Sequence, residues 1–329
     1  MKGKGLVLLT AVLLAVVVAS LVIGTRAIAP SVVLDAVLHG AAGRPDELVV
    51  TRVRVPRTVI GLLAGAALGV AGAIIQGVTR NPLSDPGILG VNSGASLGVV
   101  LAISAFGIQS MSGYVWFGFA GAALAAVVVY GVGSLGRDGA TPLKIVLAGA
   151  ACSAAFGSLT TGLLVTDDLT FDQFRFWQVG SLAGRDLAVV AQAAPFLVAG
   201  AVLAAGCGRR LNGLALGDDV ARALGQNVVL SRILCALAVV VLCGTATAMA
   251  GPIAFVGLVV PHAARLLTGP DHRWLLPYSM LLAPLLVLAA DIAGRVAAPP
   301  GEVQVGIVTA VLGAPVFVLL VRRRRQAAR

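Results

Sequence analysis

Residues 231–268 read SRILCALAVVVLCGTATAMAGPIAFVGLVVPHAARLLT and carry only two charged side chains, Arg232 and Arg265. A helix needs about 20 mostly apolar residues to cross a bilayer, so this stretch is too long for one span. Gly251-Pro252 is the natural break, because proline lacks a backbone donor and disfavours helix in the residue before it. The stretch therefore predicts two consecutive membrane helices.

The rest of the chain has the same character. Of its 329 residues 58% are apolar and only 12% are charged, and the mean hydropathy is +0.98. A soluble domain carries about 25% charged residues, and a disordered chain has low hydrophobicity, so both classes are excluded. We predict an all-α polytopic membrane protein with about ten transmembrane helices. The predicted spans are residues 6–25, 58–78, 88–108, 115–135, 144–165, 187–206, 231–249, 252–268, 274–293 and 303–321.

The charged residues predict the orientation of these spans. The count includes the first segment, because its apolar run from Leu6 to Ile23 exceeds the roughly 7–15 residues of a cleaved signal peptide. With both termini inside, 16 of the 24 basic and five of the 14 acidic residues lie on the inner side, which leaves about +11 there and −1 outside. Cytoplasmic loops carry the basic excess, so both termini are predicted to be cytoplasmic. The formal net charge of +10 thus indicates topology and a bilayer, and we expect no nucleic-acid partner.

Motifs of autonomous chemistry are missing from the sequence. It contains no GxxxxGK[ST] phosphate loop, no HExxH or GxSxG motif and no Cys/His metal pattern. The four cysteines lie in or beside apolar runs without CxxC spacing, which is typical of small packing residues. We therefore predict neither an enzyme acting alone nor a bound metal or cofactor.

Small residues form an ordered series in the second predicted span. Gly61, Gly65, Gly69, Ala73 and Gly77 recur every four residues, which places them along one helix face. Such stripes let helix backbones approach closely within a membrane. The series predicts close packing inside the bundle.

A short basic segment precedes that span on the predicted outer side. It carries Arg52, Arg54 and Arg57. Arginine pairs bidentately with carboxylates, so the segment favours docking of an acidic partner. The alternative is that these side chains extend to the membrane interface.

The longest inner loop, about residues 208–231, contains a second unusual segment. Residues 214–225 predict a short amphipathic helix that Asp218 or Asp219 caps at its start and Gly225 ends. Such a helix either docks into a groove of another protein or lies flat on the membrane, and the pattern alone leaves both open.

Two further segments complete the set. Asn81 to Gly87 contains Asn-Pro and Pro-Gly and predicts a tight inner turn. Asp291 and Arg295 stand four residues apart and are expected to pair on one helix face.

Taken in order, these segments resemble the FecCD-type permease subunits of ABC importers for ferric siderophores, haem and vitamin B12. The resemblance spans nearly the whole chain. Its carriers are Arg54-Val55-Pro56-Arg57; Asn81-Pro82-Leu83-Ser84-Asp85-Pro86-Gly87-Ile88-Leu89-Gly90; Leu216 to Gly225; Gly251-Pro252-Ile253-Ala254-Phe255-Val256-Gly257-Leu258-Val259-Val260-Pro261-His262 with Arg265; Ala290-Asp291 with Arg295; and Gly313-Ala314-Pro315-Val316-Phe317.

The resemblance implies an assembly and a mechanism. Residues 1–329 would form one transmembrane permease domain in the inner membrane of a prokaryote, with outer loops at about 26–57, 166–186 and 294–302. Two permease copies would form a channel that works by alternating access. Two ABC ATPase subunits, which hold the ATP and Mg²⁺, would bind below, and an extracytoplasmic substrate-binding protein would dock above.

The resemblance also implies roles for particular residues. Arg54, Arg57 and Arg295 match outer arginines that pair with glutamates of the binding protein. Asn81 and Leu83 match a turn that helps to close the cytoplasmic gate. The residues that match the loop inserted into the ATPase are Leu216, Gly217, Asp218, Asp219, Val220, Ala221, Arg222, Leu224 and Gly225.

Ferric siderophores are the expected substrates because they dominate this family, and haem and vitamin B12 stay open, as does whether the second permease is identical. An ion-coupled secondary transporter of a small solute is the alternative. It would need an acidic residue deep within the membrane, and the middles of the predicted spans contain none. A scaffold or receptor without transport would leave the 214–225 segment unexplained. The segment after Arg295, with Pro299-Pro300-Gly301, departs from the family pattern.

Overall fold

The computed structural model describes residues 2–40, 43–108, 110–135, 141–298 and 301–327, and within these ranges every regular element is a helix. A single π-turn (η1, Val50–Arg54) and a 3-10 turn (η2, Pro86–Leu89) accompany the α-helices. The α-helices are α1 Lys2–Val22, α2 Pro30–His39, α3 Pro45–Val49, α4 Val55–Thr79, α5 Val91–Ser104, α6 Met111–Gly133, α7 Pro142–Thr166, α8 Asp168–Gln178, α9 Leu187–Ala215, α10 Asp218–Ala223, α11 Val228–Ala250, α12 Val256–Thr268, α13 His272–Ala297 and α14 Val305–Ala327.

Each predicted span coincides with a helix, which confirms a helical polytopic membrane protein. Among the described residues, seven helices are long and apolar enough to cross a membrane. They are Lys2–Val22, Pro45–Thr79, Gly113–Gly133, Leu143–Thr166, Leu187–Ala215, Val228–Ala250 and His272–Ala297. Helices α5 and α12 are apolar but have 14 and 13 residues, about 20 Å at 1.5 Å per residue, against a hydrocarbon core of about 30 Å.

Helix α4 forms the centre of the bundle, and in the most apolar stretch of residues 45–79, 78% of the residues are buried. A Cβ added at Gly65 would lie 2.8 Å from the Pro284 Cα, and one at Gly69 would lie 2.5 Å from the Ser279 carbonyl oxygen. These positions face α13, so the predicted glycine stripe is confirmed as the surface on which α13 packs. Within a bilayer such close backbone contact is a main source of helix association.

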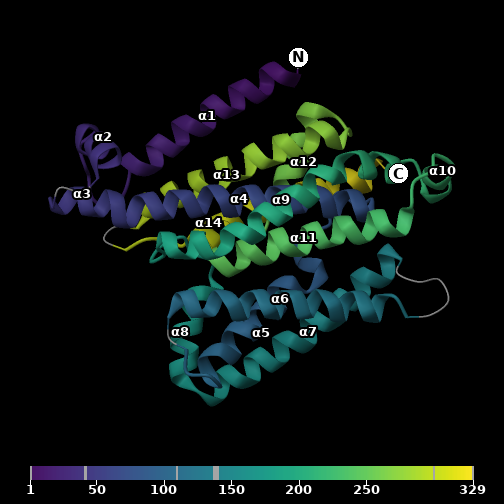
Figure 1. Cartoon of the computed structure of the whole chain (residues 1–329), viewed down its shortest axis with the longest axis horizontal. Helices are drawn as coiled ribbons and strands as arrows, with labels where there is room; N and C mark the ends of the chain where they lie inside the picture. The colour runs from purple at the N-terminus through teal and green to yellow at the C-terminus, as the bar shows by residue number, and fades with distance from the viewer. Residues whose placement is uncertain (1, 41–42, 109, 136–140, 299–300, 328–329) are drawn as a thin grey trace.

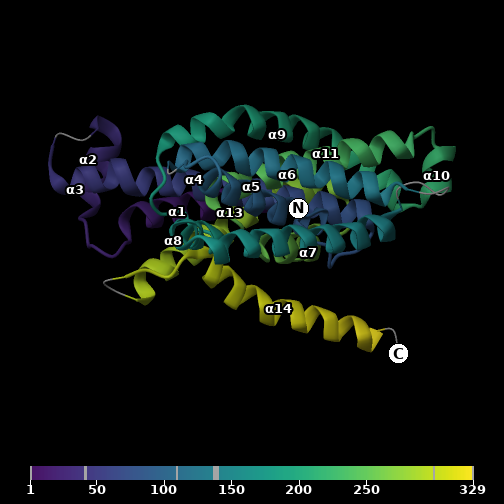
Figure 2. The same ribbon diagram turned by 90° about the horizontal axis from the view of Figure 1, so that it is seen from below.

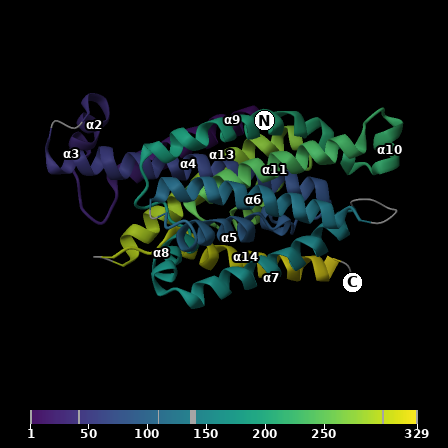
Figure 3. The ribbon, with the colours of Figure 1, turned by 60° about the horizontal axis from the view of Figure 1, so that its bottom comes forward.

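The helices form two groups. Figure 1 shows α4, α9, α11, α12 and α13 together, with α1 across their upper side and α5, α6, α7 and α8 below them. In Figure 3 the α5–α8 group comes forward, whereas α14 packs mainly on α13 and α12. Figure 2 shows α14 diverging from the bundle toward its end.

The predicted break in residues 231–268 is present. Helix α11 ends at Ala250, and Gly251 follows with φ 73°. A Cβ on Gly251 would lie 2.2 Å from the Trp177 carbonyl oxygen. Both the positive φ and this close contact therefore require glycine here. Helix α12 begins at Val256, four residues later than its predicted start, because residues 251–255 form a non-helical connection between α11 and α12.

The predicted connections contain more helix than expected and occupy opposite ends of the bundle. Residues 45–79 are continuously helical, so the arginine segment predicted in an outer loop lies on a helix. Figures 1 and 2 place α2, α3 and α8 at one end and α10 at the other. The segments predicted to lie outside and the segment predicted to lie inside are thus at opposite ends of the bundle. Pro299 and Pro300 lie outside the described residues.

Candidate functional site

Arg54 is the first of the predicted docking arginines, and it is buried. Its side chain is only 4% exposed. The guanidinium donates hydrogen bonds of 2.5 to 2.8 Å to the carbonyl oxygens of Leu21, Val22 and Arg26. Arg54 therefore satisfies the open carbonyl groups at the C-terminal end of α1, as cations near helix C-termini commonly do.

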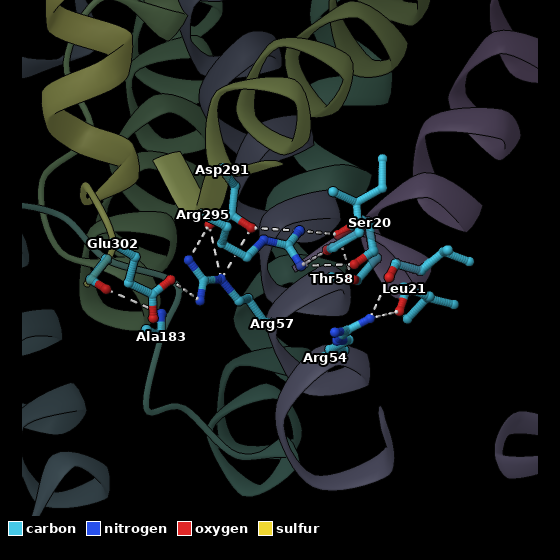
Figure 4. A network of polar contacts seen from close by, with 12 residues as sticks. Ser20, Leu21, Arg54, Arg57, Thr58, Ala183, Asp291, Arg295 and Glu302 are labelled. Carbon is cyan, nitrogen blue, oxygen red and sulfur yellow. Dashed lines mark hydrogen bonds and ion pairs between the residues drawn. The ribbon is translucent and has the colours of Figure 1, made fainter. Parts of the chain in front are cut away.

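Arg57 and Arg295 share one buried carboxylate, Asp291 (Figure 4). Arg57 donates through Nε and Nη2 to Asp291 Oδ1 at 2.9 and 2.8 Å, and its Nη1 lies 2.6 Å from Glu302 Oε2. Arg295 Nη2 lies 3.0 Å from Asp291 Oδ2, which confirms the predicted pair of residues four apart. Arg295 also donates to the carbonyl oxygen and hydroxyl of Ser20 at 2.8 and 2.9 Å.

These contacts join α1, α4, α13 and the segment before α14 at one point. Asp291 is fully buried, and Arg57 and Arg295 are each 4% exposed. A buried charge is tolerated only when it is paired and hydrogen-bonded, and here the two arginines meet the carboxylates of Asp291 and Glu302. We call this set of four the outer ion cluster.

The structure thus brings the three predicted docking arginines to one end of the bundle but engages each of them within the chain. The exposed arginines at this end are others. Arg26 pairs with Asp46 at 2.9 Å and Arg44 with Glu47 at 3.5 Å, while Arg52 is exposed. Binding-protein contact by Arg54, Arg57 and Arg295 stays a prediction, and any such contact has to form beside or in place of these internal bonds.

At the opposite end, part of the predicted 214–225 segment forms a short helix, α10 (Asp218–Ala223), while Leu214 and Ala215 end α9. Helix α10 follows Gly217, whose φ of 108° is accessible to glycine, and Gly225 with φ 79° comes two residues after it. Ala221 is buried against the bundle. Leu216, Val220 and Leu224 are 61%, 47% and 69% exposed, which makes an apolar surface that nothing in the described chain covers. We call these three residues the apolar knob.

The expected capping of α10 by an aspartate is wrong. Gly217 occupies the cap position, and no side chain accepts a hydrogen bond there. Asp218 instead forms ion pairs with Arg80 and, at 2.9 Å, with Arg232. Asp219 pairs with Arg222 on the outside of the helix at 2.9 Å. The carboxylate of Asp218 is held by two arginines and is therefore not available to accept a hydrogen bond from a backbone amide at the start of α10.

Arg80 connects α10 to the predicted gate turn. It ends α4 in the left-handed conformation with φ 50°, and Asn81 follows directly. Asn81 Oδ1 accepts a hydrogen bond from the Leu83 amide at 3.1 Å, so residues 81–83 form the first part of the predicted 81–87 turn, closed by its own asparagine. The ion pair between Asp218 and Arg80 thus links the helix with the apolar knob to the turn that contains Asn81 and Leu83. We call it the inner link.

A cavity of about 850 Å³ lies between α4, α9 and α13. Its walls are mostly apolar, and none of the predicted docking, coupling or gate residues lines it. In the part of the chain that the structure describes, no group of three or more His, Cys, Asp and Glu side chains could hold a metal ion. The charged chemistry described above lies instead at the two ends of the bundle.

Sequence reasoning missed three contributors to these sites: Glu302, Arg80 and Arg232. Glu302 lies 245 positions from Arg57, and Arg80 lies 138 positions from Asp218. In a single sequence, ion pairs can be predicted only between residues three or four apart on one helix. The only hint for these three residues was that each lies at the end of a predicted span, where charged side chains are common.

Comparison with protein families finds one description that covers almost all of the chain. Residues 12–323 match the FecCD transport family. Among curated proteins, the ferric enterobactin transport system permease protein FepD of Escherichia coli (strain K12) is 48% identical over 306 residues, which are 93% of this chain and 91% of that protein.

Two further relatives are similar over most of their length. The iron(3+)-hydroxamate import system permease protein FhuB of Bacillus subtilis (strain 168) is 40% identical, covering 93% of this chain and 80% of that protein. The cobalamin import system permease protein BtuC of Halobacterium salinarum is 38% identical, covering 84% and 74%. A solved inward-facing metal-chelate type ABC transporter superposes with a TM-score of 0.85 at 30% identity, covering 98% of this chain and 99% of that one.

Proposed function

The chain belongs to the FecCD transport family, and from this premise we propose that it is the permease subunit of an ATP-driven importer for ferric siderophores. The observation that carries the proposal is the 48% identity with a ferric enterobactin permease along nearly the full length of both chains. Relatives named for iron-hydroxamate and ferric citrate transport support iron chelates as the substrate class. One relative is named for cobalamin, which keeps vitamin B12 as the second candidate, with haem.

The proposed assembly contains two permease subunits, two ABC ATPase subunits and an extracytoplasmic binding protein. This chain would contribute residues 1–329 as one domain with ten spans and both termini in the cytoplasm of a prokaryotic inner membrane. The basic excess on the α10 side supports that orientation. The permease itself would bind no cofactor and catalyse no reaction, since ATP and Mg²⁺ would be held by the ATPase chains.

Coupling to the ATPase is proposed to run through α10. The apolar knob of Leu216, Val220 and Leu224 is left uncovered by the described chain, and an apolar helix face of this kind can dock into a groove of a partner. When the ATPase subunits close around ATP, they would draw α10 with them. The inner link would pass this displacement to Arg80 and so to Asn81 and Leu83 at the gate, in an alternating-access cycle.

Docking of the binding protein is proposed to involve Arg54, Arg57 and Arg295 through exchange of partners. Asp291 is fully buried, whereas the side chain of Glu302 is 30% exposed. Glu302 is therefore the carboxylate of the outer ion cluster that a glutamate of the binding protein would replace. The exchange of one carboxylate for another leaves Arg57 paired throughout.

The alternative, an ion-coupled secondary transporter, requires transport without an ATPase. One carboxylate, Asp291, is buried within a span: it lies two residues inside the end of the predicted span 274–293, on α13. Its two arginine partners neutralise it and leave it unsuited to a proton or ion relay. The comparisons do not favour this alternative.

Replacement of residues 218–222 by a Gly/Ser linker tests the coupling proposal. We expect the variant to lose ATPase association in pull-down and ATP-driven uptake, because the linker removes α10 and the inner link together. A matched replacement of residues 34–38 in α2 at the outer end, a segment that like 218–222 is largely exposed and contains one buried alanine, serves as the control and should retain both. Uptake that is unchanged in the 218–222 variant would contradict the proposal.

A further inference from the structure

A second group of charged residues lies at the outer end, apart from the outer ion cluster. A pocket of about 410 Å³ opens between η1, the start of α6 and the loop from α8 to α9. Arg52, Ser110, Arg185 and Asp186 line it, with the apolar side chains of Val53 and Val189. We call it the Arg185 pocket.

Arg185 differs from the other buried arginines at this end. It is 4% exposed, yet none of its three side-chain nitrogens has a hydrogen-bond partner in the described structure. Arg54, Arg57 and Arg295, which are buried to the same degree, each donate several hydrogen bonds. Burial lowers the pKa of Arg185 to about 10, so its guanidinium is still charged at neutral pH. A buried guanidinium without partners costs free energy and calls for an acceptor.

The charges around the pocket define which acceptor fits. Arg52 and Arg185 bring two positive charges, and Asp186 brings one negative charge. The Asp186 carboxylate is engaged, because it accepts a hydrogen bond from the Val189 amide at 3.2 Å at the start of α9. One positive charge therefore remains to be neutralised. A single carboxylate supplies that charge, and its two oxygens match the fork of a guanidinium.

The position of the pocket adds two supporting features. It lies at the N-terminal end of the 29-residue helix α9, where the helix dipole favours an anion. It also has an exposed rim formed by Arg52 and Ser110, so a carboxylate can enter from the outer side.

We propose that the Arg185 pocket is a carboxylate-binding site, in which Arg185 receives the carboxylate at the base and Arg52 contacts it at the rim. The carboxylate belongs either to an acidic side chain of the docked binding protein or to an anionic iron chelate. Only this choice of owner rests on the proposed function; the binding chemistry does not.

Acetate is a suitable probe for the site itself. The full-length chain in lipid nanodiscs is titrated with acetate against chloride at constant ionic strength and pH, and the midpoint of thermal unfolding is recorded. We expect acetate to raise the midpoint of the wild-type chain. Arg185→Gln should weaken the apparent affinity by about tenfold or more, since hydrogen bonds to a charged group are worth about 1.5–3 kcal/mol. A wild-type chain that does not respond, or an Arg185→Gln chain that responds equally, overturns the proposal.

Two other variants separate a binding role from a structural one. Arg52 is exposed, so Arg52→Gln leaves the fold intact and should weaken acetate binding by a smaller factor. Arg175→Gln, at an exposed arginine of α8 paired with Asp172, is the matched control and should respond as the wild type. In chloride alone, Arg185→Gln should raise the unfolding midpoint, because it removes an unpaired buried charge. A lower midpoint there would show that ordered water already satisfies Arg185, and would count against the site.

The two sources are distinguished by docking measurements. If the carboxylate belongs to the binding protein, Arg185→Gln weakens docking of the ligand-free binding protein, and acetate competes with docking to the wild type. If it belongs to the chelate, docking of the ligand-free protein is unchanged and only the free ferric chelate loses affinity for the variant. The wild-type chain could support ATP-driven uptake in vesicles and yet show no stabilisation by acetate. That result would refute carboxylate binding in the Arg185 pocket and leave the proposed function intact.

Discussion

Glu302 and Asp291 hold the same arginine, Arg57, but differ in what they can do. Asp291 is fully buried between two arginines, so its role is to keep α4 and α13 together. The side chain of Glu302 is 30% exposed, so of the two carboxylates it is the one that a partner can approach. At the residue scale, the outer ion cluster thus combines a permanent pair with a replaceable one.

This difference predicts the effect of Glu302→Gln. The change removes the competing carboxylate, so docking of the binding protein should tighten by up to about tenfold, the worth of one charge-assisted hydrogen bond. The affinity should also become more sensitive to salt. Surface-captured binding protein at two ionic strengths gives both quantities.

Asp35→Asn is the matched control for this experiment, because it removes an acidic charge from the same end at a side chain that is 62% exposed. A Glu302→Gln chain that docks no more tightly than Asp35→Asn would show that Arg57 does not meet the binding protein.

In the α10 segment, Asp218 forms the ion pairs to the rest of the chain, and the apolar knob is exposed. The two roles can be tested separately. Asp218→Asn breaks the inner link but keeps the apolar knob. We expect ATPase association to be retained and the ratio of siderophore imported to ATP hydrolysed to fall. Asp219→Asn, at a neighbouring side chain that is 98% exposed, is the control and should leave the ratio unchanged. Equal ratios for the two variants would refute transmission through Asp218.

The pH dependence of the inner link has a defined sign. Burial raises the pKa of Asp218, but the hydrogen bond from Arg80 and the charges of Arg232 and Arg80 outweigh it and hold the pKa below its ordinary value. A carboxyl group with a lowered pKa contributes stability above its unfolded pKa of about 3.9 and loses that contribution as the pH falls through the lowered value. The coupling ratio should therefore not change between neutral pH and about pH 5 because of Asp218.

The contact between α4 and α13 gives a prediction about packing. Gly69→Ala places a Cβ 2.5 Å from both the Ala283 Cβ and the Ser279 carbonyl oxygen, so the isolated subunit in detergent should lose about 1–3 kcal/mol of stability. Gly157→Ala in α7 is the control, because nothing lies within 4 Å of its added Cβ. That variant should be neutral or gain about 0.5–1 kcal/mol. Thermal unfolding that ranks the two variants alike would contradict the assigned packing.

Across the whole molecule, sequence pattern predicted what depends on neighbouring residues. Hydropathy located a helix for each expected span, Gly251-Pro252 marked the break, and the glycine period identified the face of α4 that α13 covers. The burial of Arg54 and the pairing of Arg57 with Asp291 depend on residues 28 to 234 positions apart, which no local pattern encodes. In the sequence, an arginine near a span end has the same pattern around it whether its side chain contacts a partner protein or the interior of the bundle.

The same reason explains the capping error at α10. An aspartate at the start of a short helix ordinarily accepts a backbone hydrogen bond. Asp218 lies instead between Arg80 and Arg232, which only the folded bundle brings together. Helix type and position are local properties, whereas the partner of a charged side chain is a property of the assembled molecule.

The central claim is that this permease imports a ferric siderophore by ATP hydrolysis on partner subunits. The most direct measurement is uptake of a radioiron-labelled siderophore into proteoliposomes that contain the chain, its ATPase and its binding protein. We expect uptake to require ATP and to vanish with a hydrolysis-deficient ATPase, even when a proton or sodium gradient is imposed. Gradient-driven uptake by the chain without its ATPase would contradict the claim.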